Sequence, residues 1–185
     1  MTVRTELIEA ARRGSAADVE SLIRDVWPHA FRIASGILHD RALAEDAAQE
    51  ACASVYLTIA KLRRVDAFKV WFYRIVARQA LAVRRRSPSA VAPFEPAVGD
   101  VREFERSVVR LDVVAALARL SPAQRAAVVL HFYADLNSRE IARVLQIPDS
   151  SVRFHLMRAR RALERTLGDA ESGNRTFAEA IAGAV

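Results

Sequence analysis

Residues 136–167 constrain the fold of this chain most strongly, because they contain two short helical patterns separated by a tight break. Asn137 and Glu140 predict a capping box, in which each side chain bonds a backbone N–H group at the other's position. Pro148 and Asp149 end the first pattern and offer a new N-cap. The second pattern carries an apolar stripe at helical spacing, made by Val152, Leu156, Ala159, Leu163 and Leu167. A short helix, a break and a basic helix predict a helix-turn-helix, whose second helix lies in the DNA major groove.

The side of the second helix opposite this stripe is basic but also carries large apolar residues: Phe154, Met157, Arg158, Arg161 and Arg165. A helical hairpin with a solvated arginine face is the plain alternative, since arginine suits a helix surface. Phe154 argues against it, because a helix that needs only solubility has little use for an outward aromatic ring. A base-reading helix can place that ring against a thymine methyl group. We therefore favour contact with nucleic acid.

The composition suits a packed, helical protein of one medium or two small domains, with 185 residues of which 52% are apolar. A net charge of +6 favours a polyanionic partner without choosing between nucleic acid and a membrane surface. The distribution of charge is more informative. Residues 61–86 contain nine Lys or Arg residues against the single Asp66, whereas residues 40–50 are acidic except for Arg41.

Several kinds of site and location are not expected. The single cysteine, Cys52, excludes an internal disulfide, and we expect it to be a small buried residue. The four histidines show no zinc-ligand spacing with it, so neither a metal nor another cofactor is expected. The first residues are charged and no stretch approaches the roughly 20 apolar residues of a membrane span, so we expect a cytoplasmic protein without membrane insertion.

The first part of the chain predicts two helices with unusual surfaces. The helix expected at residues 41–61 has Leu43, Val55 and Leu57 among its apolar positions, and carries a polar, acidic patch of Asp46, Gln49 and Glu50, together with Glu45. Periodicity alone favours a solvated face for that patch. The helix expected at residues 67–86, with Asp66 as its cap, interleaves aromatic residues with arginines. Such a helix suits a single-stranded nucleic acid, because aromatic rings can stack on bases and cations can contact phosphates. The aromatic residues could also simply fill the core, and we expect Phe68 and Phe72 in the core and Trp71 at its margin.

A change of composition divides the chain. Residues 87–100 hold three prolines and a glycine without helical periodicity, which indicates an extended linker. We therefore expect an all-α protein of two helical domains joined by a flexible linker, with the helix-turn-helix in the second. The expected bounds are residues 1–86 for the first domain, 87–103 for the linker, 104–168 for the second domain and 169–185 for a tail. Ser121, Pro122 and Gln124 predict a second capping box within the second domain.

Three segments in this order carry a specific resemblance: AEDAAQEA (44–51), FKVWFYRIVAR (68–78) and LSPAQRAAVVLHFYADLNSREIARVLQIPDSSVRFHLMRARRAL (120–163). Together they resemble the extracytoplasmic-function group of bacterial RNA polymerase sigma factors, over roughly residues 15–167. The resemblance implies a promoter-specificity subunit without catalytic activity, which binds core RNA polymerase and promoter DNA and directs transcription initiation. It also makes an anti-sigma protein a candidate partner.

The family implies roles for particular surfaces. Asp46, Gln49 and Glu50 would dock on the β′ clamp helices, and the linker would thread toward the active-centre cleft. The first domain would capture the melted non-template strand of the −10 element at the matching positions Lys61, Arg63, Arg64, Trp71, Arg74 and Arg78. The second domain would dock on the β flap and read the −35 element. Its contacts map onto Ser151, Arg153, Phe154, Met157 and Arg158, while Arg139, Arg160 and Arg161 are better candidates for phosphate.

This chain departs from the family pattern at a few of these positions. Arg78 stands where asparagine is usual and Ala82 where aspartate is usual, and both bear on the −10 preference. Phe154 and His155 stand where a small residue followed by arginine is usual, so the −35 preference should be atypical.

Two other classes of function fit the sequence less well. An ordinary DNA-binding regulator would use the helix-turn-helix but would need neither the aromatic-arginine helix nor its acidic neighbour. An enzyme acting on nucleic acid would need paired carboxylates in a cleft, a phosphate-binding glycine loop or a metal cluster, and the sequence offers none of these.

Overall fold

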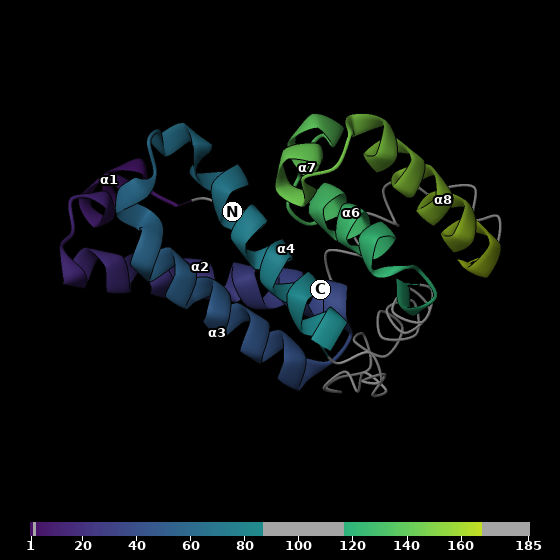
Figure 1. Cartoon of the computed structure of the whole chain (residues 1–185), viewed down its shortest axis with the longest axis horizontal. Coiled ribbons are helices and arrows are strands. Elements are labelled where there is room, and N and C mark those ends of the chain that lie inside the picture. The colour runs from purple at the N-terminus through teal and green to yellow at the C-terminus, as the bar shows by residue number, and fades with distance from the viewer. Residues whose placement is uncertain (2, 87–116, 168–185) are drawn as a thin grey trace, which may run out of the picture.

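The computed structural model describes residues 1, 3–86 and 117–167, with side-chain surroundings up to residue 162, and all regular structure in these ranges is helical. The first group of helices is α1 (Thr5–Arg12), α2 (Ala16–Leu38), α3 (Arg41–Thr58) and α4 (Phe68–Arg86), with the short 3₁₀ turns η1 (Ile59–Lys61) and η2 (Val65–Ala67) between the last two (Figure 1). The second group is α6 (Pro122–Phe132), α7 (Ser138–Leu145) and α8 (Asp149–Leu167). The expected all-α class is confirmed. The linker and tail predicted at residues 87–103 and 169–185 lie outside the described residues.

Local signals set most helix starts. The Ser15 hydroxyl accepts a hydrogen bond from the backbone N–H of Asp18 at the start of α2, and Asp40 caps α3 in the same way through Leu43. Both predicted capping boxes are present, Ser121 with Gln124 and Asn137 with Glu140. These side chains occupy backbone donors that the first helical turn leaves unpaired, so each helix begins at a defined residue.

Two predicted helix starts are wrong. Asp66 does not cap α4, because its carboxylate accepts from the Arg64 side chain and η2 precedes the helix. Asp149 is the first helical residue of α8 and not its N-cap. The preceding helix already ends at Leu145, and its C-cap Gln146 adopts a left-handed conformation with φ of 56°. The turn therefore begins before Pro148, which moves Asp149 into the first turn of α8.

The first group packs α2 against both α3 and α4 around large buried side chains, including Leu22, Ile33, Ile37, Phe68, Phe72 and Tyr73. Leu57 was counted among the apolar positions of α3 together with Val55, but 75% of it is exposed. Val55 and Ile59 take the buried positions of that turn. A residue two positions after Val55 is turned by about 200° around the helix, so Leu57 faces solvent.

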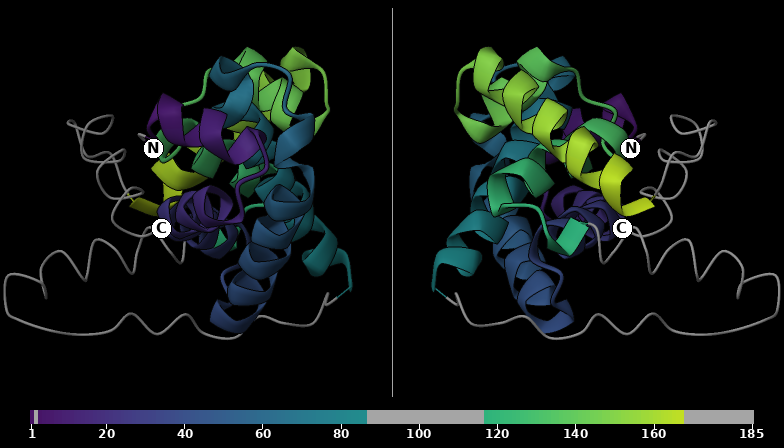
Figure 2. Two further views of the ribbon diagram at one scale, coloured as in Figure 1. Left: turned by 90° about the vertical axis from the view of Figure 1, so that its left-hand side faces the viewer. Right: turned by 90° about the vertical axis from the view of Figure 1, so that its right-hand side faces the viewer.

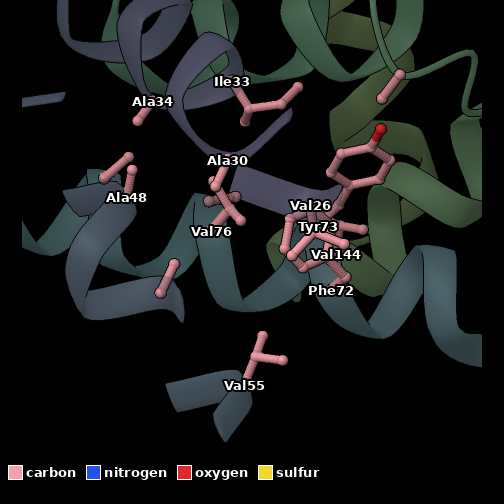
Figure 3. Packing of buried hydrophobic residues seen from close by; sticks show 14 of the residues in the cluster. Val26, Ala30, Ile33, Ala34, Ala48, Val55, Phe72, Tyr73, Val76 and Val144 are labelled. Carbon is pink, nitrogen blue, oxygen red and sulfur yellow. The ribbon is translucent and has the colours of Figure 1, made fainter. Parts of the chain in front are cut away.

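The second group packs directly on the first, with α7 against α4 and α6 against α2 (Figure 2). Apolar residues of both groups form one continuous core, in which Val144 of α7 lies with Val26, Phe72 and Tyr73 (Figure 3). Polar contacts join the groups at the edge of this core. The Lys69 ammonium donates to the backbone carbonyl of Asp135 at 3.1 Å. The Tyr133 hydroxyl lies 3.3 Å from Nδ1 of His29.

One charged residue is buried where α6 meets the first group. Arg125 is only 4% exposed, and its Nε atom has no hydrogen-bond partner. Burial, followed by repulsion from Arg84 of α4, lowers the pKa of Arg125 to about 10. Burial and the nearby Arg125 charge lower the pKa of His39, at the end of α2, to about 3. The contact between the groups therefore combines favourable apolar burial with an unfavourable buried cation.

Candidate nucleic-acid interface

The outward side of α8 presents an exposed face that is both basic and apolar. Val152 and Ala159 are fully buried and fix the inward side of the helix, which packs on α6 and α7. Phe154 is 50% and Met157 41% exposed on the other side, as the stripe predicts. Helix α8 lies at the end of the molecule away from α2 and α3, so the first group does not cover this face (Figure 1).

Two arginines of this face, Arg153 and Arg158, make different contacts. A guanidinium nitrogen of Arg153 lies 3.3 Å from the carboxylate of Asp149, one turn earlier in α8. The guanidinium of Arg158 lies over the ring of Phe154, 5.5 Å from its centroid. A cation at this distance is attracted by the negative face of the ring. The sequence predicted the outward positions of Phe154 and Arg158, but not that the guanidinium of one lies over the ring of the other.

The remaining positions predicted to contact the −35 element surround this pair. Arg161 is exposed further along α8, and Ser151 is partly buried in its first turn. Arg139 is exposed at the second position of α7. His155, by contrast, turns partly inward and its Nδ1 atom is buried. The structure thus places the predicted set on the outer side of the helix-turn-helix and leaves His155 out of it.

Helix α7 and the turn that follows it support α8. The Asn137 side chain accepts from the Glu140 backbone N–H at 3.0 Å, and a Glu140 carboxylate oxygen accepts from the Asn137 N–H at 2.9 Å. Ile141 and Val144 anchor the short helix in the core. The left-handed Gln146 then reverses the chain into α8.

A second basic surface lies on α4 and the connection before it. Arg74 and Arg78 are exposed, and Trp71 is partly buried, with its ring centroid 5.9 Å from that of Phe68. These residues are spaced three and four apart, so they share one side of α4. Trp71 lies at the core margin, and Phe68 and Phe72 lie inside, as predicted. Lys61 at the end of η1 is exposed, as are Arg63 and Arg64 between η1 and η2, and Arg64 donates to Asp66.

The acidic patch on α3 is exposed and continues into an apolar end. Asp46, Gln49 and Glu50 all face solvent, while the alanines between them face the core. Tyr56 and Leu57, which the sequence analysis did not assign to this surface, are 53% and 75% exposed. Leu57 follows Glu50 by seven residues, which is two helical turns. That spacing is the signal that could have placed Leu57 beside the acidic patch.

The described part of the chain offers neither a metal cluster nor a membrane span. No group of three or more His, Cys, Asp or Glu side chains there could hold a metal ion. None of its helices is long and apolar enough to span a membrane. Cys52 is buried as predicted, and burial raises the pKa of its thiol to about 11.

Comparisons with known proteins agree over most of the chain. The family model of Sigma-70 region 2 matches residues 11–88, and that of Sigma-70 region 4 matches residues 110–163. The RNA polymerase sigma-H factor of Pseudomonas aeruginosa is 29% identical over 178 residues, covering 88% of this chain and 92% of that protein. The ECF RNA polymerase sigma factor SigM of Mycobacterium tuberculosis is 30% identical over 172 residues, covering 91% and 86%.

Solved structures show the same fold. CnrH in complex with the cytosolic domain of CnrY matches with a TM-score of 0.65 and 18% identity, over 88% of this chain and 96% of that one. The sigma factor RpoE in complex with the anti-sigma factor NepR from Bartonella quintana matches with a TM-score of 0.64 and 19% identity, over 83% and 98%.

Proposed function

The chain belongs to the extracytoplasmic-function group of RNA polymerase sigma factors, which direct promoter recognition and transcription initiation, and we propose how its surfaces divide this work. Residues 1–86 act as the region 2-like domain and residues 104–168 as the region 4-like domain, with 87–103 as linker and 169–185 as tail. The observation that carries the proposal is the presence, on one chain, of an acidic α3, a basic-aromatic α4 and an exposed basic α8.

The last helix reads the −35 duplex. Arg153, Phe154, Met157 and Arg158 face base edges, with Ser151 at the entry of the helix, while Arg139 and Arg161 face phosphates. An arginine that donates two hydrogen bonds to guanine contributes roughly 1–3 kcal/mol of discrimination. Contacts to phosphate set the position of the protein but carry no sequence information.

The first domain captures the melted −10 strand. Trp71 offers a partly exposed ring for base stacking, and Arg74 and Arg78 follow the phosphates on the same side of α4. The exposed Lys61, Arg63 and Arg64 extend this basic surface ahead of the helix. Stacking of a base on an aromatic side chain contributes roughly 1–3 kcal/mol, which offsets the energy needed to unstack it from the duplex.

Helix α3 docks on core RNA polymerase. Asp46, Gln49 and Glu50 meet the β′ clamp helices, and the exposed Leu57 extends the contact with an apolar side chain. The second domain docks on the β flap. An anti-sigma protein is a further proposed partner, supported by the complex in which the structural neighbour RpoE is bound to the anti-sigma factor NepR.

A binding and transcription experiment with the full chain tests this proposal. Core polymerase is titrated with the chain, and the resulting holoenzyme is offered a pool of promoter fragments in run-off transcription. The double substitution Asp46→Ala and Glu50→Ala should weaken core binding at least tenfold. The double substitution Glu20→Ala and Asp25→Ala removes the same charge from exposed positions of α2 and should leave binding unchanged.

If the two double variants bound core polymerase with equal affinity, α3 would not be part of the docking surface. If the unmodified chain did not bind core polymerase but bound duplex DNA, the helix-turn-helix would serve an ordinary DNA-binding regulator instead.

A further inference from the structure

The proposed contact of α8 with duplex DNA supports a more specific statement about what the helix reads. We infer that Phe154 and Arg158 act as one unit, which selects a thymine and a guanine in neighbouring base pairs of the upstream element. The inference rests on the proposed function, because it requires α8 to enter the major groove.

The two side chains lie close together on the surface. Phe154 and Arg158 are one helical turn apart on the exposed side of α8, and the guanidinium lies 5.5 Å from the ring centroid. Four residues of helix advance by about 6 Å, which is less than two base-pair steps of ~3.4 Å. The two side chains can therefore reach adjacent base pairs, but not distant ones.

The chemistry of each side chain selects a different base. In the major groove, thymine alone among the four bases presents a methyl group, and an apolar ring gains by covering it. Guanine presents two acceptors, O6 and N7, which match the two parallel N–H groups of a guanidinium. The attraction between the guanidinium charge and the ring face uses no hydrogen-bond acceptor, so contact with the ring and donation to guanine are compatible.

Stacking also prepares Arg158 for binding. An arginine side chain has many rotamers, and immobilising such a side chain on binding is unfavourable. The ring of Phe154 restricts Arg158 before DNA arrives, so part of the loss of side-chain entropy has already occurred in the free protein. Loss of the ring should therefore weaken guanine selection as well as thymine selection.

Arg153 differs from Arg158 in this respect. Its guanidinium is 3.3 Å from the Asp149 carboxylate, whose acceptors compete with a base for the same N–H groups. A negative charge beside Arg153 also offsets its attraction to DNA. These contacts assign the stronger base discrimination to Arg158.

The test removes one methyl group from DNA. Holoenzyme made with the full chain first selects promoters from a random pool, and each thymine of the selected upstream element is then replaced by deoxyuridine, which lacks only the methyl group. At one position the substitution should lower promoter binding about fourfold, the factor expected for one buried methyl group. The thymine at that position should adjoin a guanine.

Variants separate the two halves of the pair. Phe154→Ala should abolish the difference between thymine and deoxyuridine, while Phe154→Leu should keep part of it and weaken guanine selection. Arg158→Lys retains the charge but not the paired N–H groups, so it should lower guanine selection about tenfold and keep the methyl effect. Arg139→Ala is the matched control and should weaken binding to all sequences alike.

Several results would overturn the inference. The inference fails if deoxyuridine has no effect on the unmodified chain at any position of the upstream element. It also fails if Phe154→Ala keeps the original preference for thymine, or if the sensitive thymine has no guanine in an adjacent base pair. Each leaves the proposed function intact if the holoenzyme still initiates from selected promoters. A holoenzyme that selects no promoter would instead overturn the function and the inference together.

Discussion

His39 shows how one residue links the packing of this protein to pH. It ends α2 in a left-handed conformation with φ of 53°, and burial together with the Arg125 charge lowers its pKa to about 3. An unfolded histidine has a pKa near 6.5, so between these values the unfolded state binds the additional proton. The stabilising contribution of neutral His39 is therefore complete above about pH 6.5 and is lost as the pH falls toward 3.

We predict that His39→Asn makes the folded protein less sensitive to mild acid. Asparagine tolerates the left-handed cap but does not titrate in this range. Between pH 7 and pH 5, the free energy of unfolding of the unmodified chain should fall more steeply, by up to ~1.4 kcal/mol per pH unit relative to the variant. Urea denaturation at several pH values measures both slopes, and parallel slopes would contradict the buried, neutral state of His39.

At the scale of single elements, α7 depends on its capping box. It has only eight residues, which is too short to be stable alone, so its start must be held by the caps and its body by the core. The capping box also sets the first turn of the helix-turn-helix.

We predict that Asn137→Ala lowers the free energy of unfolding by about 1 kcal/mol, because the backbone N–H of Glu140 loses the side-chain oxygen that accepts its hydrogen bond. Asn137→Ser keeps a capping oxygen and should recover most of the loss. Chemical denaturation compares the three proteins. Equal stability of the alanine and serine variants would show that the side-chain cap does not stabilise the helix.

The elements also show which features a sequence can predict. Both capping boxes and the outward face of α8 depend on residues within about two turns of helix, and they were predicted correctly. The positions of Asp66, Asp149 and Leu57 were predicted wrongly. Which partner a side chain bonds, and which side of a helix is buried, depend on contacts in the folded protein. Burial of Tyr73 escaped prediction for a related reason: it faces α7, which is far away in the sequence.

For the site, the sequence predicted the outward residues of α8 but not how they interact. Residue spacing places Phe154 and Arg158 on one side, yet their stacking depends on side-chain conformation. The contact of α6 and α7 with the first group was not predicted either. Nothing in the spacing of Arg125 or Val144 indicates that the two helical groups share a core.

For the whole molecule, this shared core conflicts with simultaneous contact to both promoter elements. The −10 and −35 elements are about 25 base pairs apart, which is about 85 Å of duplex at ~3.4 Å per pair. A compact body of about 135 residues has a radius of gyration of about 14 Å. If the protein binds both elements at once, as proposed, the two groups must therefore separate.

We predict that this separation can be followed by fluorescence energy transfer between labels on Glu20→Cys of α2 and Arg143→Cys of α7. Both positions are exposed, and the buried Cys52, whose thiol pKa is raised, should react slowly. Transfer should be efficient in the free chain and should fall when core polymerase and promoter are added. Unchanged transfer in the initiating complex would show that the groups remain packed.

We further predict that Arg125→Met stabilises the packed arrangement by roughly 1–3 kcal/mol, since it fills similar space without burying a charge. Energy transfer between the same labels should persist to higher polymerase concentrations. Arg119→Met removes a charge at an exposed position and is the matched control. If the two variants behaved alike, the buried guanidinium would have no part in separating the groups.

The buried Arg125 also gives the contact between the groups a particular response to temperature. Apolar burial weakens on cooling, and the energy needed to strip water from a charged group is greater in the cold. Both effects act in the same direction at this contact. Cooling should therefore weaken the contact between the two groups and increase the fraction of molecules in which they are separated. Warming should increase the fraction in which they are packed.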